Sequence, residues 1–278
     1  MLIDTHLHLI DRGRLAYPWL AGAGSLNRDF SYEEYSRQAQ RVGIEAALHM
    51  EVDVDPSDMR AETDMVRELS HQPGSMVRGA IAACRPEDGE FPSYLEAVEA
   101  DPLVKGLRRV LHVVPDEVSE STLFRENVQR LQDSRLTFDI CMLARQLPLA
   151  AALIDAAPRA RFVLDHCGVP DITSGEFEVW KRRVTDISRR PNVTAKISGI
   201  VAYAEPESWT VETIRPYAEH VVSTFGWDRV VWGSDWPVCT LGGGLAIWVA
   251  ATQAIFGKCS AEERAKLYRS NAKRLWDL

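Results

Sequence analysis

The chain has 278 residues, of which 46% are hydrophobic and 26% are charged, so it carries enough apolar material for one large α/β core. Its 32 Lys and Arg residues are outnumbered by 40 Asp and Glu residues, and the formal net charge is -8. This balance argues against a surface built to neutralise phosphates, and we expect no nucleic-acid partner.

The cysteines, the N-terminal segment and one apolar run indicate the cellular location that we expect for this protein. The five cysteines contain no C-x-x-C pair, so we expect reduced thiols in a cytoplasmic enzyme rather than a zinc ribbon or a redox site. The first residues, MLIDTHLHLIDR, have no basic region and are not expected to be a signal peptide. The apolar run Leu245–Phe256 is too short to cross a bilayer, so we expect no membrane partner.

Short β-rich apolar runs alternate with helical patterns along the whole chain, which is typical of β/α units and a parallel sheet. Eight such runs suggest a single-domain (β/α)8 barrel of the TIM type, of class α/β, over residues 1–278, although an open doubly wound sheet would share the local pattern. The runs are Leu2–His8, Ala46–Val52, Val77–Ala83, Val104–His112, Thr137–Leu143, Arg161–His166, Val193–Ser198 and Val230–Asp235.

The first run carries two histidines that are separated by one residue. Alternation along a strand would place Asp4, His6 and His8 on one face, where two imidazoles can converge on one metal ion or one substrate oxygen. Two incidental histidines are the alternative. The glycine-containing segment 11–29 that follows is too long for a simple turn, so we expect an active-site loop there.

Two helix starts are marked by capping boxes, in which a Ser side chain and a Glu three residues later satisfy each other's backbone N–H groups. Ser31 with Glu34 predicts one helix start, and Ser260 with Glu263 predicts the other.

Arginines in and after the middle runs are candidates for holding an oxygen-rich substrate, because a guanidinium can bind a carboxylate through two hydrogen bonds. Arg108 and Arg109 are adjacent in the fourth run, so they must point to opposite faces and only one can enter the barrel. Arg108 shares its parity with His112, and Arg145 follows the fifth run. Solvent exposure is the alternative for Arg145.

The last three runs end in polar residues, at the side of the barrel where enzymes of this architecture place their active sites. His166 stands just before a turn at Gly168, and Asp235 precedes Trp-Pro, so both are expected at strand tips. A structural histidine and a helix N-cap are the alternatives. Lys196 and Ser198 share one parity on the seventh run, and Lys196 is either a substrate contact or a buried ion-pair partner.

His6-x-His8 after the first run and Gly-Ser-Asp235-Trp-Pro after the last resemble the amidohydrolase superfamily. Further motifs are similar to those of its amidohydrolase 2 branch, which holds sugar lactonases and pyrone-dicarboxylate lactonases. These motifs are Tyr17-Pro-Trp-Leu, Lys105-Gly-Leu-Arg108, Arg145-Gln-Leu-Pro, Val163-Leu-Asp-His166, Lys196-Ile-Ser198-Gly and Gly233-Ser-Asp-Trp-Pro-Val-Cys239.

The resemblance implies a lactonase in which Asp235 moves the proton of the attacking water. His6, His8 and His166 would either hold one divalent ion such as zinc, with Asp235, or donate hydrogen bonds to the substrate without a metal. The fifth run ends without a histidine, so we expect at most one ion. The expected substrate contacts are Arg108, His112, Arg145, Lys196, Ser198 and Trp236.

The substrate implied by the resemblance is a small lactone, either of the fuconolactone or rhamnonolactone type or of the muconolactone or pyrone-dicarboxylate type. A single-zinc decarboxylase that acts on a carboxylated aromatic ring is the main alternative, since such enzymes share the H-x-H, the later His and the terminal Asp. A non-catalytic binding protein on the same scaffold is a third reading. The sequence gives no indication of oligomeric state.

Overall fold

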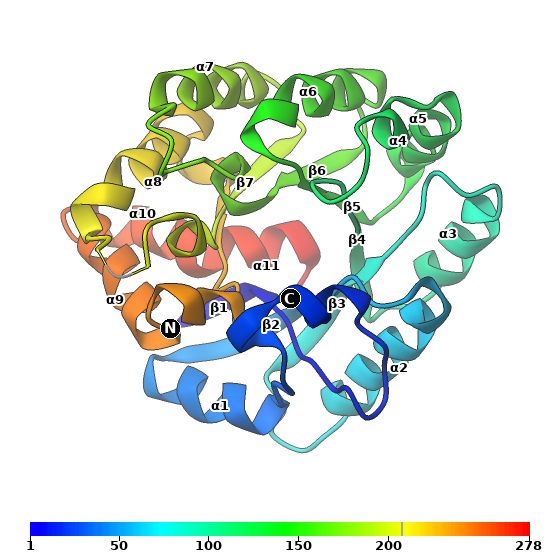
Figure 1. The fold of residues 1–278 in the computed structure, drawn as a ribbon, viewed down its shortest axis with the longest axis horizontal. Helices are drawn as coiled ribbons and strands as arrows, with labels where there is room; N and C mark the ends of the chain where they lie inside the picture. Colours follow the sequence, from blue (N-terminus) through cyan, green and yellow to red (C-terminus); the bar gives the residue numbers. More distant parts are fainter. Residues whose placement is uncertain (207) are drawn as a thin grey trace.

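The computed structural model describes residues 1–206 and 208–278, in which eight parallel strands follow one another around a barrel in sequence order (Figure 1). Each strand pairs in parallel with the next. The strands are β1 (Leu2–Leu7), β2 (Ile44–Met50), β3 (Val77–Ala83), β4 (Val104–Val110), β5 (Thr137–Cys141), β6 (Arg161–Leu164), β7 (Val193–Ile197) and β8 (Val230–Trp232).

Helices connect the strands and surround the barrel (Figure 1). Those between the strands are α1 (Tyr32–Arg41), α2 (Met59–Ser70), α3 (Phe91–Glu99), α4 (Glu117–Glu120), α5 (Thr122–Gln129), α6 (Leu147–Ala156), α7 (Phe177–Ser188) and α8 (Val211–Phe225). After β8 come α9 (Leu245–Ile255), α10 (Ala261–Ala265), a π-helical turn (Lys266–Ser270) and α11 (Asn271–Trp276). The expected β/α barrel is therefore confirmed.

The barrel closes between the chain after β8 and the end of β1. The backbone N–H of Asp235 donates to the carbonyl of His6 at 2.9 Å, and the N–H of His8 donates to the carbonyl of Trp236 at 2.7 Å. Leu7 and Trp236 form a parallel bridge between these bonds. Closure therefore brings Asp235 beside the two histidines of β1.

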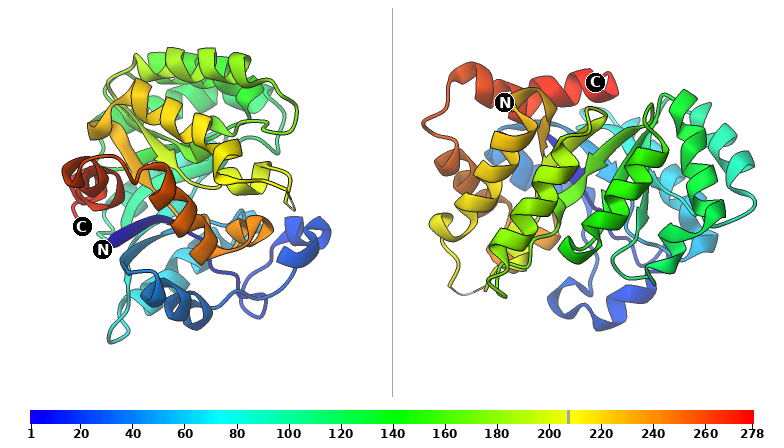
Figure 2. Two further views of the ribbon diagram at one scale, coloured as in Figure 1. Left: turned by 90° about the vertical axis from the view of Figure 1, so that its left-hand side faces the viewer. Right: turned by 90° about the horizontal axis from the view of Figure 1, so that it is seen from above.

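The two ends of the barrel differ in character. At the end where the strands begin, an apolar interior cluster is covered by α11, and the indole N–H of Trp276 donates to Oγ1 of Thr137 at 3.1 Å. The members of the cluster are Ile3, Ala46, Leu48, Met50, Ile81, Val163, Val231, Ala272 and Trp276. The 11–29 segment lies at the opposite end, where the strands finish (Figure 2).

Seven of the eight strands end one to three residues earlier than the sequence pattern suggests, and for two of them this changes how a site residue is held. β6 ends at Leu164 and β8 ends at Trp232. His166 and Asp235 then adopt left-handed backbone conformations, with φ of 50° and 56°. Both side chains are thus presented by tight turns that follow the strands, where non-glycine residues are uncommon and frequently functional.

The expectation that Asp4 shares a strand face with His6 and His8 is wrong. The register of β1 on β2 shifts between Asp4 and Leu7, which interrupts the alternation of side chains. Ile3 packs in the interior cluster, whereas Asp4 accepts a hydrogen bond from the Tyr35 hydroxyl of α1 at 2.8 Å. Asp4 therefore links β1 to α1 through this hydrogen bond, and its side chain does not point to the same place as His6 and His8.

The two expected capping boxes have different outcomes. Ser260 and Glu263 satisfy each other's backbone N–H groups at the start of α10, as expected. At the start of α1, Ser31 accepts from the N–H of Glu34 at 3.2 Å, but the carboxylate of Glu34 binds Arg28 at 2.9 Å instead of returning to Ser31. The α1 box is therefore only half formed, because an ion pair competes for its glutamate.

The helix α9 coincides with the apolar run noted in the sequence, and it packs on the barrel through Trp248, whose indole N–H donates to the Gly233 carbonyl at 2.9 Å. Across the part of the chain that the structure describes, every helix is too short or too polar to span a membrane.

The hydroxyl of Tyr35 supplies a testable contribution to stability. Asp4 is fully buried, so Tyr35→Phe is expected to lower the free energy of unfolding by about 1.5–3 kcal/mol, the range for a hydrogen bond to a charged group. Tyr32→Phe removes a hydroxyl that accepts from the Met76 N–H at 2.7 Å, and its cost should be near 1 kcal/mol. Urea unfolding of both variants checks this, and an equal or larger loss in Tyr32→Phe would contradict it.

Candidate functional site

A cavity of about 280 Å³ lies at the carboxyl ends of the strands. Its polar lining residues are His8, Asp53, Arg108, His112, His166, Tyr203 and Asp235. Its apolar lining residues lie at the end of β4 or follow β1, β2, β4 and β8, and they include Ile10, Trp19, Leu26, Val52, Val110, Val113, Pro237 and Val238. Trp19 and Leu26 belong to the 11–29 segment, so this segment forms part of the cavity wall.

Asp235 lies among three imidazoles at the base of this cavity. Its Oδ1 is 3.3 Å from Nε2 of His8 and 3.6 Å from Nε2 of His6, and its Oδ2 is 3.8 Å from Nδ1 of His166. Asp235 is 2% exposed, and the histidines are also buried. The four residues singled out in the sequence therefore come together at one point.

A hydrogen bond to the backbone determines which nitrogen of His8 is an acceptor toward the cluster. Its Nδ1 is 3.0 Å from the Met50 carbonyl, which can only accept, so Nδ1 carries the proton and Nε2 offers a lone pair. The Nε2 atoms of His6 and His8 are 3.1 Å apart. The lone pair of His8 thus points toward His6 and Asp235.

Burial makes all three imidazoles poor bases. It lowers the pKa of His8 to about 4, with help from the neighbouring Arg108 guanidinium, and holds the pKa of His6 well below its usual range. Burial also lowers the pKa of His166, although Asp235 opposes this shift. The cluster therefore contains neutral histidines at neutral pH.

The pKa of Asp235 shifts in the opposite direction. Burial raises its pKa to about 6, against the lowering effect of His166 and Arg108. A carboxylate with a pKa near the operating pH can both accept and return a proton, which is the property required of a general base and acid.

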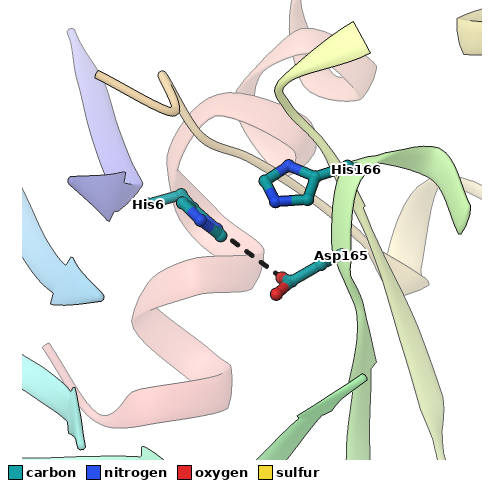
Figure 3. A group of neighbouring side chains, drawn as sticks. All are labelled: His6, Asp165 and His166. Atoms are coloured by element: carbon teal, nitrogen blue, oxygen red, sulfur yellow. Dashed lines mark ion pairs between the residues drawn. The ribbon is translucent and has the colours of Figure 1, made fainter. Parts of the chain in front are cut away.

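A buried ion network lies directly beneath this cluster. Lys196 has no exposed surface, and its Nζ is 2.7 Å from Oδ2 of Asp139 and 2.8 Å from Oδ1 of Asp165. The same Nζ is 3.2 Å from Nδ1 of His6. Figure 3 shows the carboxylate of Asp165 directed at His6, with His166 on the adjoining turn, and the ion pair between Asp165 and His6 measures 3.6 Å.

The two adjacent arginines of β4 point in opposite directions. Arg108 lines the cavity; its Nε donates to Oε1 of Glu51 at 2.6 Å, and its Nη1 is 3.3 Å from Nε2 of His6. Arg109 is not among the lining residues; it pairs with Glu87 at 2.8 Å, and its Nη1 is 3.9 Å from Oδ1 of Asp53.

The remaining expected substrate contacts are distributed differently. His112 lines the cavity, and the Oγ of Ser198 lies 3.0 Å from Nδ1 of His166. Lys196 is the buried ion-pair partner described above. Arg145 is 58% exposed and pairs with Asp116 at 2.6 Å, outside the cavity lining. Trp236 is fully buried against Phe30 and Tyr35, so it supports the turn and does not reach the cavity.

The sequence analysis did not single out Asp139, Asp165 or Glu51, although each holds a site residue in place. A weak signal exists, because each is an acidic residue within or just after an otherwise apolar strand. Tyr203, which lines the cavity next to His166, ends a short 3-10 helix (Ile200–Tyr203) after β7 and carries no periodic signal.

The donor atoms in the cluster fit one divalent ion. Nε2 of His6, Nε2 of His8 and Oδ1 of Asp235 are 3.1–3.6 Å apart, close to the separation of about 3.4 Å between tetrahedral zinc ligands placed at about 2.1 Å. A second group of potential ligands, His6, Asp165 and His166, shares His6, and its carboxylate is already paired with Lys196. The geometry therefore accommodates one ion between His6, His8 and Asp235 better than two.

Comparison with known proteins covers nearly the whole chain. A family model described as amidohydrolase matches residues 3–278. The L-fucono-1,5-lactonase of Burkholderia ambifaria is 25% identical over 97% of this chain and 93% of its own length, and the 4-sulfomuconolactone hydrolase of Rhizobium radiobacter is 23% identical over 84% and 75%. A crystal structure of an amidohydrolase from Burkholderia multivorans with bound zinc superimposes with a TM-score of 0.88, at 22% identity and 100% and 99% coverage.

The donor geometry predicts the metal content of the protein. Chains saturated with zinc and then desalted are expected to retain no more than one ion, measured by inductively coupled plasma mass spectrometry, because the two candidate ligand groups share His6. His8→Ala should weaken zinc binding, whereas His112→Asn, which changes a cavity histidine outside the donor set, should not. Two ions per chain, or loss of zinc only from His112→Asn, would contradict the assignment.

Proposed function

Because the chain belongs to the amidohydrolase family, we propose that it is a hydrolase that opens a small lactone ring with a water molecule activated by Asp235. Relatives named as lactonases support the reaction class. The observation that carries the proposal is the position of Asp235 at the base of the cavity, within 3.3–3.8 Å of three neutral imidazoles.

Asp235 is suited to accept the proton of the attacking water. With a pKa raised by burial to about 6, it is mostly ionised at neutral pH and still basic enough to take a proton. Burial lowers the pKa of His8 to about 4 and also lowers the pKa of His166, so both imidazoles are weaker bases than an ordinary histidine. Asp235 is thus the group of this cluster that both faces the cavity and can hold the proton.

The donors near Asp235 can stabilise the oxyanion that forms when water attacks the ring carbonyl. If the Ser198 hydroxyl donates to Nδ1 of His166, Nε2 carries the proton and is the nitrogen free to donate to substrate. The guanidinium of Arg108 lines the same cavity and adds positive charge. These two residues are the proposed oxyanion donors.

The reaction is completed when the tetrahedral intermediate collapses. The ring C–O bond breaks, Asp235 returns its proton to the departing alkoxide, and the product is an open hydroxy acid that contains the atoms of the lactone plus one water. A divalent ion such as zinc, bound by His6, His8 and Asp235, would add Lewis-acid polarisation of the carbonyl.

Removal of the basic group at position 235 tests the proposal. Asp235→Asn keeps the shape of the side chain, so it is expected to lower kcat by roughly 10²–10⁴-fold while product binding survives. The measurement is kcat and product affinity on a lactone identified by a pH-indicator panel, run with and without chelator. Asp53→Asn is the matched control, because Asp53 is a cavity carboxylate that pairs with Arg85. A loss in Asp53→Asn as large as that in Asp235→Asn would remove Asp235 from its proposed role.

The opposite orientations of the two β4 arginines give a second test. Arg108→Met is expected to lower kcat/KM by about 30–150-fold, equivalent to about 2–3 kcal/mol for a charge-assisted hydrogen bond, while Arg109→Met has a smaller effect. Arg108→Lys keeps a positive charge beside Glu51 and separates loss of catalysis from loss of folding. A larger effect of Arg109→Met, at unchanged thermal stability, would contradict the assignment of Arg108.

A further inference from the structure

We infer that the cavity selects neutral lactones with an apolar ring substituent, in preference to polyhydroxylated or carboxylated lactones. This inference rests on the proposed lactonase function and names the substrate class of the same site. Three features of the cavity carry it: the chemistry of its wall, the pairing of Arg108, and the small number of polar groups left for the substrate.

The wall above the catalytic cluster is apolar. The side chains that form it are Ile10, Trp19, Leu26, Val52, Val110 and Val238. The indole N–H of Trp19 already donates to the Val52 carbonyl at 2.8 Å, so its polar atom is engaged within the protein. A hydroxyl group placed against this wall would lose its water without gaining a partner, whereas a methyl or alkyl group would be well accommodated.

The positive charge in the cavity is already balanced. Among the described residues that line it, Arg108 is the one permanent cation; its Nε donates to the carboxylate Oε1 of Glu51 and its Nη2 to the backbone carbonyl of Glu51, at 2.6 Å each. Its Nη1 is 3.5 Å from Oδ2 of Asp165. The lining also contains Asp53 and Asp235, so a carboxylated substrate would meet two acidic groups and no uncompensated cation.

The polar groups that face the substrate match the needs of one ester. His166 and Arg108 serve the carbonyl oxygen, Asp235 serves the water, and Tyr203 lines the cavity with its ring centroid 6.2 Å from that of His166. The volume of about 280 Å³ corresponds to on the order of nine water molecules, enough for one substituted ring. His112 and Asp53 also line the cavity, but Nδ1 of His112 is 3.1 Å from Sγ of Cys141 and Asp53 pairs with Arg85 at 3.3 Å. These partners reduce the hydrogen-bonding capacity that remains for a ring with several hydroxyls.

Three six-membered lactones test this preference. δ-Hexalactone carries a methyl group at C6, 6-oxotetrahydropyran-2-carboxylate carries a carboxylate at the same position, and glucono-1,5-lactone has the same ring and carbon count with added hydroxyls. After correction for spontaneous hydrolysis, kcat/KM for δ-hexalactone is expected to exceed that of the other two by roughly 100-fold. The corresponding lactams, 6-methylpiperidin-2-one, 6-oxopiperidine-2-carboxylate and glucono-1,5-lactam, measure binding by calorimetry without turnover.

A charge added at the rim gives the complementary test. Val113 lines the cavity mouth and is 61% exposed, so an arginine there need not bury its charge. Val113→Arg should raise kcat/KM for the carboxylate probe about tenfold, and Val113→Leu, an uncharged apolar control, should not.

The outcomes separate this inference from the proposed function. Preference for the methyl compounds in both turnover and binding supports both. Tighter binding of the methyl lactam without turnover of any lactone supports the cavity preference and rejects the lactonase reaction. Preference for the hydroxylated or carboxylated probe, or no binding of any of them, overturns the inference.

Discussion

The buried ion network of Lys196, Asp139 and Asp165 is the constraint on which the site depends. A fully buried ammonium persists only when nearby carboxylates compensate its charge, and here one lies on β5 and the other just after β6. Burial alone would raise the pKa of Asp165, but Lys196 and the neighbouring imidazoles outweigh it and hold that pKa well below its usual range. Asp165 is therefore a fixed negative charge beneath the cavity, and His6 is held between it and Lys196.

Burial also gives the titratable groups of the site different functions, because it shifts their pKa values in opposite directions. Desolvation disfavours the charged form of any group, so it lowers the pKa of His8 and raises that of Asp235. Neutral imidazoles surround a carboxylate whose pKa lies close to neutrality. Because Glu51 balances Arg108, the cavity gains a hydrogen-bond donor without a surplus of positive charge.

The fold and the residues at the barrel mouth could be predicted because parallel strands all finish at one end. His6, His8, His166 and Asp235 each stand at or just after such a finish, so their convergence follows from the barrel. The orientation of Asp4 could not be predicted, because the alternation of apolar and polar residues in the sequence does not reveal a register shift inside β1. The partners Asp165 and Glu51 depend on neighbours across the barrel, which only the closed structure brings together.

The pH dependence of kcat/KM, measured on a lactone that the protein hydrolyses, tests the role of Asp235 most directly, because this parameter reports the pKa of the free enzyme's essential base. Asp235 must be ionised to accept a proton. Activity should therefore fall as the pH is lowered through about 6, the pKa that burial gives this carboxyl, and the fall should be absent from the residual activity of Asp235→Asn. A fall in kcat/KM whose midpoint lies near the ordinary pKa of an aspartate would contradict the account. The same fall at low pH in Asp235→Asn would also contradict it.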